Sequence, residues 1–117
     1  MNLWIDDDKP APEGWAVAKS YGAAVDLLRR FTYDTIAIDH DLGDDDSPTG
    51  YDILCMMERG DLPRPKAICV ISWNAVGAKR MLAALAQMPD VTNLGWDLQQ
   101  SVSGWSSENR PKVGEAP

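Results

Sequence analysis

The sequence is poor in the residues on which several classes of protein depend. Its two cysteines, Cys55 and Cys69, form neither a disulfide framework nor a CxxC metal motif, so we interpret both as small core residues. It has no run of about 18 consecutive apolar residues, the length that a membrane-spanning helix requires. The first residues also lack the basic and apolar regions of a signal peptide. We therefore expect a cytoplasmic protein that does not cross a membrane.

Basic residues are also few. The chain has 11 Lys and Arg against 18 Asp and Glu, a net charge of -7, whereas a protein that binds duplex DNA through its phosphates needs a basic face. The acidic residues are clustered, because eight of the fourteen aspartates lie within 6–8 and 39–46. At 117 residues, 44% of them hydrophobic, the chain has the size and composition of one folded domain. We expect no duplex DNA partner.

The apolar pattern predicts short strands that alternate with amphipathic helices. Ser20 and Asn74 stand where helix N-caps are expected, and the segment 91–98 is compatible with an additional edge strand. Residues 1–100 are expected to form the domain and residues 101–117 a polar tail. The expected strands cover 2–6, 14–19, 35–39 and 66–72, and the expected helices cover about 21–31, 50–60 and 75–87.

This alternation predicts right-handed βαβ crossovers and a parallel sheet of strand order 2-1-3-4 in a three-layer α/β sandwich. The segment between the first two strands is too short and too rich in proline for a helix. Ligands of such sheets bind at the carboxyl ends of the strands, where the strand order reverses. Asp6 to Asp8 and Asp39 to Asp41 stand at those ends, and Ser72 and Asn74 follow the neighbouring strand.

Several carboxylates in one pocket repel one another, and a divalent cation removes that repulsion. Mg²⁺, or Mn²⁺ in its place, prefers carboxylate and phosphate oxygens. We expect Asp6, Asp7 and Asp39 to hold the ion, with Asp39 as a ligand or a nucleophile. The backbone carbonyl of Asp41 is a further candidate ligand. Ser72 and Asn74 are expected to bind phosphate oxygens, together with the N-terminus of the helix that follows.

Each of these assignments has a simpler alternative. Ser72 and Asn74 could be ordinary helix-capping residues. Asp44, Asp45 and Asp46 lack the spacing of an EF-hand and could be only a charged loop. The single histidine, His40, could be a general acid or base oriented by a neighbouring carboxylate, or could pack against the next helix. Trp73, beside Ser72, could line the site or stack on a nucleobase, and Trp96 and Trp105 could cover a bare sheet edge.

At this point the motifs resemble a known family. IDDD, IDHDLG and ISWN resemble the receiver domains of two-component systems. More closely, MNLWIDDDKPAPEGW, AIDHDLG, TGYDIL and the SxN step resemble cyclic-phosphate processing receiver domains, from Met1 to about Leu85. The resemblance implies a flavodoxin-like sheet, with Asp6, Asp7 and Asp39 at the acidic-pocket positions and Ser72 at the hydroxyl position. The name of the family implies action on a cyclic phosphate.

Two departures set this sequence apart from ordinary receiver domains. Those domains carry a lysine at the end of a fifth strand, where it binds the phosphoryl group, and no lysine follows such a strand here. The usual first helix is also missing, so phosphorelay signalling is not expected. Our first hypothesis is a metal-dependent phosphoesterase acting on a nucleotide or an RNA end, with Asp39, Asp41 or His40 moving the proton. The alternatives are a degenerate receiver that binds a phosphorylated ligand or a protein partner, and phosphorylation of Asp39 itself.

Overall fold

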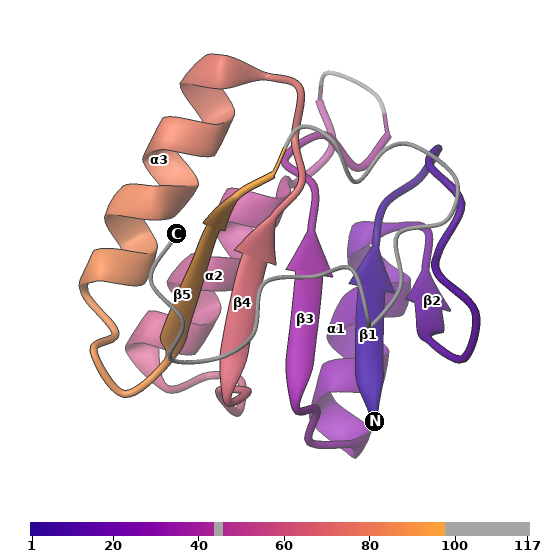
Figure 1. The fold of residues 1–117 in the computed structure, drawn as a ribbon, viewed down its shortest axis with the longest axis horizontal. Helices are drawn as coiled ribbons and strands as arrows, with labels where there is room; N and C mark the ends of the chain where they lie inside the picture. Colours follow the sequence, from indigo (N-terminus) through magenta and orange to yellow (C-terminus); the bar gives the residue numbers. More distant parts are fainter. Residues whose placement is uncertain (44–45, 98–117) are drawn as a thin grey trace.

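The computed structural model describes residues 1–43 and 46–97 (Figure 1). It contains a five-stranded sheet of order β2-β1-β3-β4-β5, in which all neighbouring strands are parallel. The predicted order is confirmed, and the additional edge strand is β5. The strands are β1 (Asn2–Ile5), β2 (Ala16–Ala18), β3 (Thr35–Ile38), β4 (Ala67–Val70) and β5 (Thr92–Trp96), and the helices are α1 (Tyr21–Arg30), α2 (Gly50–Arg59) and α3 (Ala75–Ala86). The chain therefore has the flavodoxin-like α/β fold.

Polar side chains fix where the helices begin. The Oγ of Ser20 accepts a hydrogen bond from the backbone N–H of Ala23, so the predicted N-cap of α1 is confirmed. Thr49 and Asp52 form a capping box at the start of α2, in which each side chain accepts from the backbone N–H of the other. Gly60 ends α2 in the left-handed conformation, at a φ of 86°.

One face of the sheet carries the main core, and all three helices pack on it (Figure 1). Leu3, Ile36 and Ile68 contribute to this face from the three central strands. The apolar spacing of the sequence predicts inward residues on α2 and α3, and these meet the sheet: Ile53, Leu54, Met57, Ala78, Met81 and Leu85 are buried, and Leu82 is partly buried against them. The burial of this apolar surface is what holds the helices against the sheet.

Ala24, Leu27, Leu28 and Phe31 recur at i, i+3, i+4 and i+7, which predicts one buried stripe on α1, and this prediction is correct only in part. Ala24 and Leu28 are buried, but the side chain of Phe31 is 47% exposed. The helix ends at Arg30, and Phe31 takes an extended conformation with a φ of -133°. Its side chain therefore leaves the helical stripe on which the prediction placed it.

A smaller core lies on the other face of the sheet. It consists of Trp4, Trp15, Ala37, Cys69 and Ile71, and no helical residue of the described ranges belongs to it. The predicted third layer is therefore not found in the described residues, because no helix forms between β1 and β2 to cover this face. The rings of Trp4 and Trp15 meet edge to face, with their centroids 6.0 Å apart. Trp15 reaches this position from the segment between β1 and β2, which forms no helix, as expected. Cys69 is buried as predicted, whereas its counterpart on α2 is only partly buried.

Several predictions concern residues outside the described ranges. These are the polar tail 101–117, Trp105, and two members of the second acidic cluster, Asp44 and Asp45. Within the ranges that the structure does describe, no helix has the length and apolar character needed to span a membrane.

Candidate functional site

Three carboxylates meet at the carboxyl ends of β1 and β3. Backbone hydrogen bonds that continue the strand pairing place two of them there. Asp6 donates its N–H to the carbonyl of Ala18 at 3.1 Å, and Asp39 donates its N–H to the carbonyl of Ile5 at 2.9 Å. Asp6 is 1% exposed and Asp39 is 6% exposed, whereas Asp7 is exposed. One oxygen from each of the three lies within 4.8 Å of the others. The three residues expected to share a pocket are therefore brought together.

The two carboxylate oxygens of Asp6 have different surroundings. Oδ1 accepts hydrogen bonds from the backbone N–H groups of Asp8 at 2.9 Å and Lys9 at 3.1 Å, which shapes the loop after β1. Oδ2 is buried and accepts no hydrogen bond within the described residues. The Nζ of Lys9 lies 2.8 Å from it, a close ionic contact whose geometry is not that of a hydrogen bond. A buried carboxylate oxygen requires a positive charge nearby, and in this structure the ammonium of Lys9 supplies it.

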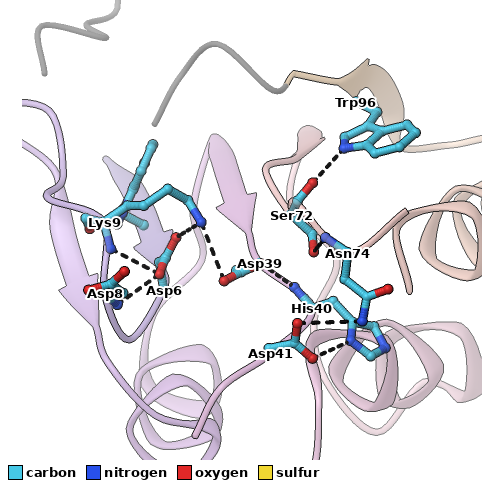
Figure 2. A network of polar contacts seen from close by, with 10 residues as sticks. Asp6, Asp8, Lys9, Asp39, His40, Asp41, Ser72, Asn74 and Trp96 are labelled. Carbon is cyan, nitrogen blue, oxygen red and sulfur yellow. Dashed lines mark hydrogen bonds and ion pairs between the residues drawn. The ribbon is translucent and has the colours of Figure 1, made fainter. Parts of the chain in front are cut away.

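Lys9 is the site residue that the sequence did not reveal. Its Nζ lies between the two buried carboxylates, 2.8 Å from Asp6 Oδ2 and 3.5 Å from Asp39 Oδ2 (Figure 2). Burial by itself lowers the pKa of Lys9, but the close contacts with the negatively charged carboxylates of Asp6 and Asp39 outweigh it and leave the pKa above its ordinary value. The ammonium group is therefore charged at neutral pH. The available signal was its position directly after three aspartates.

Asp39 is held by neighbours on several sides. Its Oδ1 accepts from the backbone N–H of His40 at 2.8 Å. Its pKa is raised, first by burial and then by the charge of Asp6, and the ammonium of Lys9 and a hydrogen bond from the Ser72 side chain oppose that rise. The carboxylate thus carries an electrostatic cost that an added cation would relieve.

His40, Asp41 and Asn74 form a second polar group beside the first (Figure 2). The Nδ1 of His40 lies 2.9 Å from Asp41 Oδ1, and Asn74 Nδ2 donates to Asp41 Oδ2 at 3.5 Å. The side chain of Asp41 is therefore engaged here rather than with the three carboxylates. The His40 ring packs against Gly77 of α3, where any side-chain carbon would overlap it. The carboxylate orientation expected for His40 therefore occurs, whereas its ring packs against α3 and not against the next helix along the chain, α2.

The turn after β4 brings polar groups to the same edge. Ser72 is buried, and its Oγ accepts from the backbone N–H of Asn74 at 3.0 Å. The side chain of Asn74 accepts from the backbone N–H of Gly77 at 3.0 Å, so Asn74 is the N-cap of α3 and Ser72 is not a cap. The indole N–H of Trp96 on β5 donates to the Ser72 carbonyl at 2.6 Å, a contact that the weak pattern near the end of the chain did not predict.

Trp73 lies at the rim of this group. Its side chain is 67% exposed, and its ring centroid is 5.3 Å from the Nζ of Lys9. At the end of β5, Trp96 is followed by Asp97, so the lysine of ordinary receiver domains has no counterpart at this position. The cationic group near the acidic pair comes instead from Lys9, at the other end of the domain sequence.

Comparison with known proteins identifies a family for this chain. The model of the cyclic-phosphate processing receiver domain family matches residues 1–87. The chain belongs to this family. The matched segment contains every residue of the site described above except Trp96 and Asp97 at the end of β5. No curated protein matches the sequence.

A solved structure supports the fold of this cyclic-phosphate processing receiver domain. It is the crystal structure of a response regulator protein from Burkholderia pseudomallei with a phosphorylated aspartic acid, a calcium ion and citrate. The two are 20% identical, with a TM-score of 0.56 over 83% of this chain. The match covers 59% of that chain, so the present sequence corresponds to only part of that protein. At this identity the likeness concerns the fold alone.

Proposed function

We propose that this domain holds a divalent cation between Asp6, Asp7 and Asp39, and that it acts on a cyclic phosphate as a phosphoesterase. The observation that carries the proposal is the Oδ2 atom of Asp6. It is buried and lies in a cluster of carboxylate oxygens within 4.8 Å, and the one ammonium group beside it, that of Lys9, neutralises only part of the charge of the three carboxylates. The family to which the chain belongs supplies the substrate class.

The donor set fits Mg²⁺, or Mn²⁺ in its place. Both ions prefer oxygen ligands, and Mg²⁺ uses one or two carboxylates together with waters and phosphate oxygens. Two of the three carboxylates are buried and the third, that of Asp7, is exposed. When bound, such an ion polarises a phosphoryl group and lowers the pKa of water.

The residues around the cluster would bind the phosphate and move a proton. The hydroxyl of Ser72 and the amide of Asn74 stand at the N-terminus of the twelve-residue helix α3, whose dipole favours an anion. Asp39 is one candidate base, because its raised pKa lies closer to neutral pH than that of an ordinary carboxyl group. The pair of Asp41 and His40 is the other, since the carboxylate orients the imidazole ring. The substrate in this proposal is a nucleotide or an RNA end.

The test is hydrolysis of 2′,3′-cyclic and 3′,5′-cyclic nucleotides by the purified protein with Mg²⁺ or Mn²⁺. Turnover by the wild type, and its loss in Asp39→Asn by on the order of 10²-fold or more, would support the proposal. Asp26→Asn is the matched control, because it makes the same chemical change on the exposed surface of α1 and should retain full activity. Metal binding without turnover of either substrate would rule out the phosphoesterase.

The ion pairs of Lys9 favour a second candidate, a module that binds a phosphorylated ligand or a protein partner without turnover. The ammonium of Lys9 already neutralises part of the negative charge of Asp6 and Asp39. The arrangement of these side chains is therefore also compatible with a domain that catalyses no reaction. In this case Asp39→Asn would change ligand affinity, and no cyclic nucleotide would be consumed by the wild type.

A further inference from the structure

The side chain of Lys9 lies where an incoming cation would have to bind. Its Nζ contacts Asp6 Oδ2 at 2.8 Å and Asp39 Oδ2 at 3.5 Å, and only 10% of the side chain is exposed. These two side chains also belong to the cluster of carboxylate oxygens. A single ammonium group therefore neutralises part of a site that carries three carboxylates.

The contact is not that of a surface lysine that happens to fall near an acid. The backbone N–H of Lys9 donates to Asp6 Oδ1 at 3.1 Å, and its carbonyl accepts from the indole N–H of Trp4 at 3.0 Å. Trp4 is itself fully buried in β1. Both backbone groups of Lys9 are thus fixed, and the side chain enters the pocket from a defined point (Figure 2).

An ion and the ammonium cannot both use these oxygens. Mg²⁺ sits about 2.0–2.1 Å from its ligands, so an ion bound to Asp6 Oδ2 would come very close to Nζ, and the two positive charges would repel. Lys9 has four flexible carbons in its side chain and can move its charge by rotation. The ring of Trp73 already lies 5.3 Å from Nζ and offers a contact on the exposed side.

We propose that Lys9 competes with the divalent cation for Asp6 and Asp39, and that the displaced ammonium then binds the phosphate of the ligand. This inference rests on the cation site of the proposed function. Three carboxylates and one ammonium leave a net charge of -2, which repels an anion. A divalent cation brings that sum to zero and releases the ammonium. The cation therefore binds first and the phosphate second, and each increases the affinity of the other.

The experiment measures the affinity of Mn²⁺ alone by isothermal titration calorimetry. Lys9→Gln should bind Mn²⁺ about tenfold more tightly than the wild type or better, because the competitor is gone. Lys9→Arg keeps the positive charge and should stay close to the wild type. Lys66→Gln is the matched control: it removes one exposed positive charge at the amino end of β4, away from the site, and should leave the affinity unchanged.

A second arm tests the phosphate contact with dimethyl phosphate, a phosphodiester anion that the protein need not hydrolyse. It should raise the Mn²⁺ affinity of the wild type by a larger factor than that of Lys9→Gln, which keeps the contacts of the phosphate with the ion, Ser72 and Asn74 but lacks the ammonium. A third measurement needs no substitution. In wild-type protein with ¹³C-methylated lysines, Mg²⁺ should shift one of the five lysine resonances far more than the others.

The outcomes separate this inference from the proposed function. Equal Mn²⁺ affinity in the wild type and Lys9→Gln, or equal shifts of all lysine resonances, would overturn the competition while the cation site stands. Absence of Mn²⁺ binding in every variant would overturn both. Tighter binding by Lys9→Gln without turnover of cyclic nucleotides would support the competition and remove only the phosphoesterase.

Discussion

Gly50, the first residue of α2, lies directly against the backbone carbonyl of Asp39. A side-chain carbon at this position would overlap that carbonyl oxygen and also press on Ile38. The backbone N–H of Gly50 donates to the carbonyl of His40 at 2.8 Å, which draws the helix onto the end of β3. The absence of a side chain at residue 50 is therefore what lets α2 support the acidic residue at the centre of the site.

Gly50→Ala is expected to destabilise the fold and to displace Asp39. The added methyl group meets backbone rather than a flexible side chain, so the free energy of unfolding should fall by about 1–3 kcal/mol in a urea titration. Gly22→Ala is the control, since nothing lies within 4 Å of the added carbon in α1, and it should be neutral or slightly stabilising. Equal stability of the two variants would contradict the packing described.

The close approach of Gly50 illustrates what the sequence could and could not predict. The strand order, the helices and the caps Ser20 and Asn74 follow from patterns among residues that are close together in the sequence. The convergence of Asp6, Asp7 and Asp39 also follows, because carboxyl ends of parallel strands meet at one edge. These features need only periodicity and topology.

The features that the sequence did not predict depend on where side chains point in three dimensions. The sequence contains five lysines, and no pattern indicates that Lys9 turns back onto the carboxylate of Asp6. The contact between Trp96 and the Ser72 carbonyl joins residues 24 positions apart and depends on the register of β5 beside β4, which includes an irregularity between Ile68 and Val70. The prediction that Phe31 is buried is wrong because α1 ends at Arg30, one residue before the apolar pattern ends.

Asn74 can be tested as a cap and as a ligand in one comparison. Asn74→Ala and Ser20→Ala each remove the side chain that caps a helix, so each should lower the free energy of unfolding by about 1 kcal/mol. Only Asn74→Ala also removes the contact with Asp41 at 3.5 Å. We expect it alone to weaken binding of a cyclic nucleotide in the presence of Mg²⁺, measured by calorimetry. Equal ligand affinity in both variants would leave Asn74 with the role of a cap only.

The buried thiol of Cys69 should make stability depend on pH in the alkaline range. Burial raises its pKa from 9.0 to about 12, so the unfolded chain ionises first and the stabilising difference is lost as pH rises above 9.0. By pH 10 the loss should reach about 1.4 kcal/mol relative to neutral pH. Cys69→Ala should lack this component, so the unfolding free energies of the two proteins should converge or cross between pH 8 and 10. Parallel profiles would show that the thiol is not buried as described.

Asp39→Asn should have opposite effects on the metal-free and metal-loaded proteins. The pKa of Asp39 is raised, so its ionised form is disfavoured in the folded state, and at neutral pH the neutral amide should stabilise the metal-free fold. Mg²⁺ at about 100 times its dissociation constant should stabilise the wild type by about 2.7 kcal/mol and Asp39→Asn by much less. Urea unfolding with Mg²⁺ and with EDTA measures both effects. If Asp39→Asn is less stable than the wild type without metal and is still stabilised by Mg²⁺, Asp39 is not a ligand of the cation. A ligand carboxylate is repelled by its neighbours when the metal is absent and is stabilised when the metal binds.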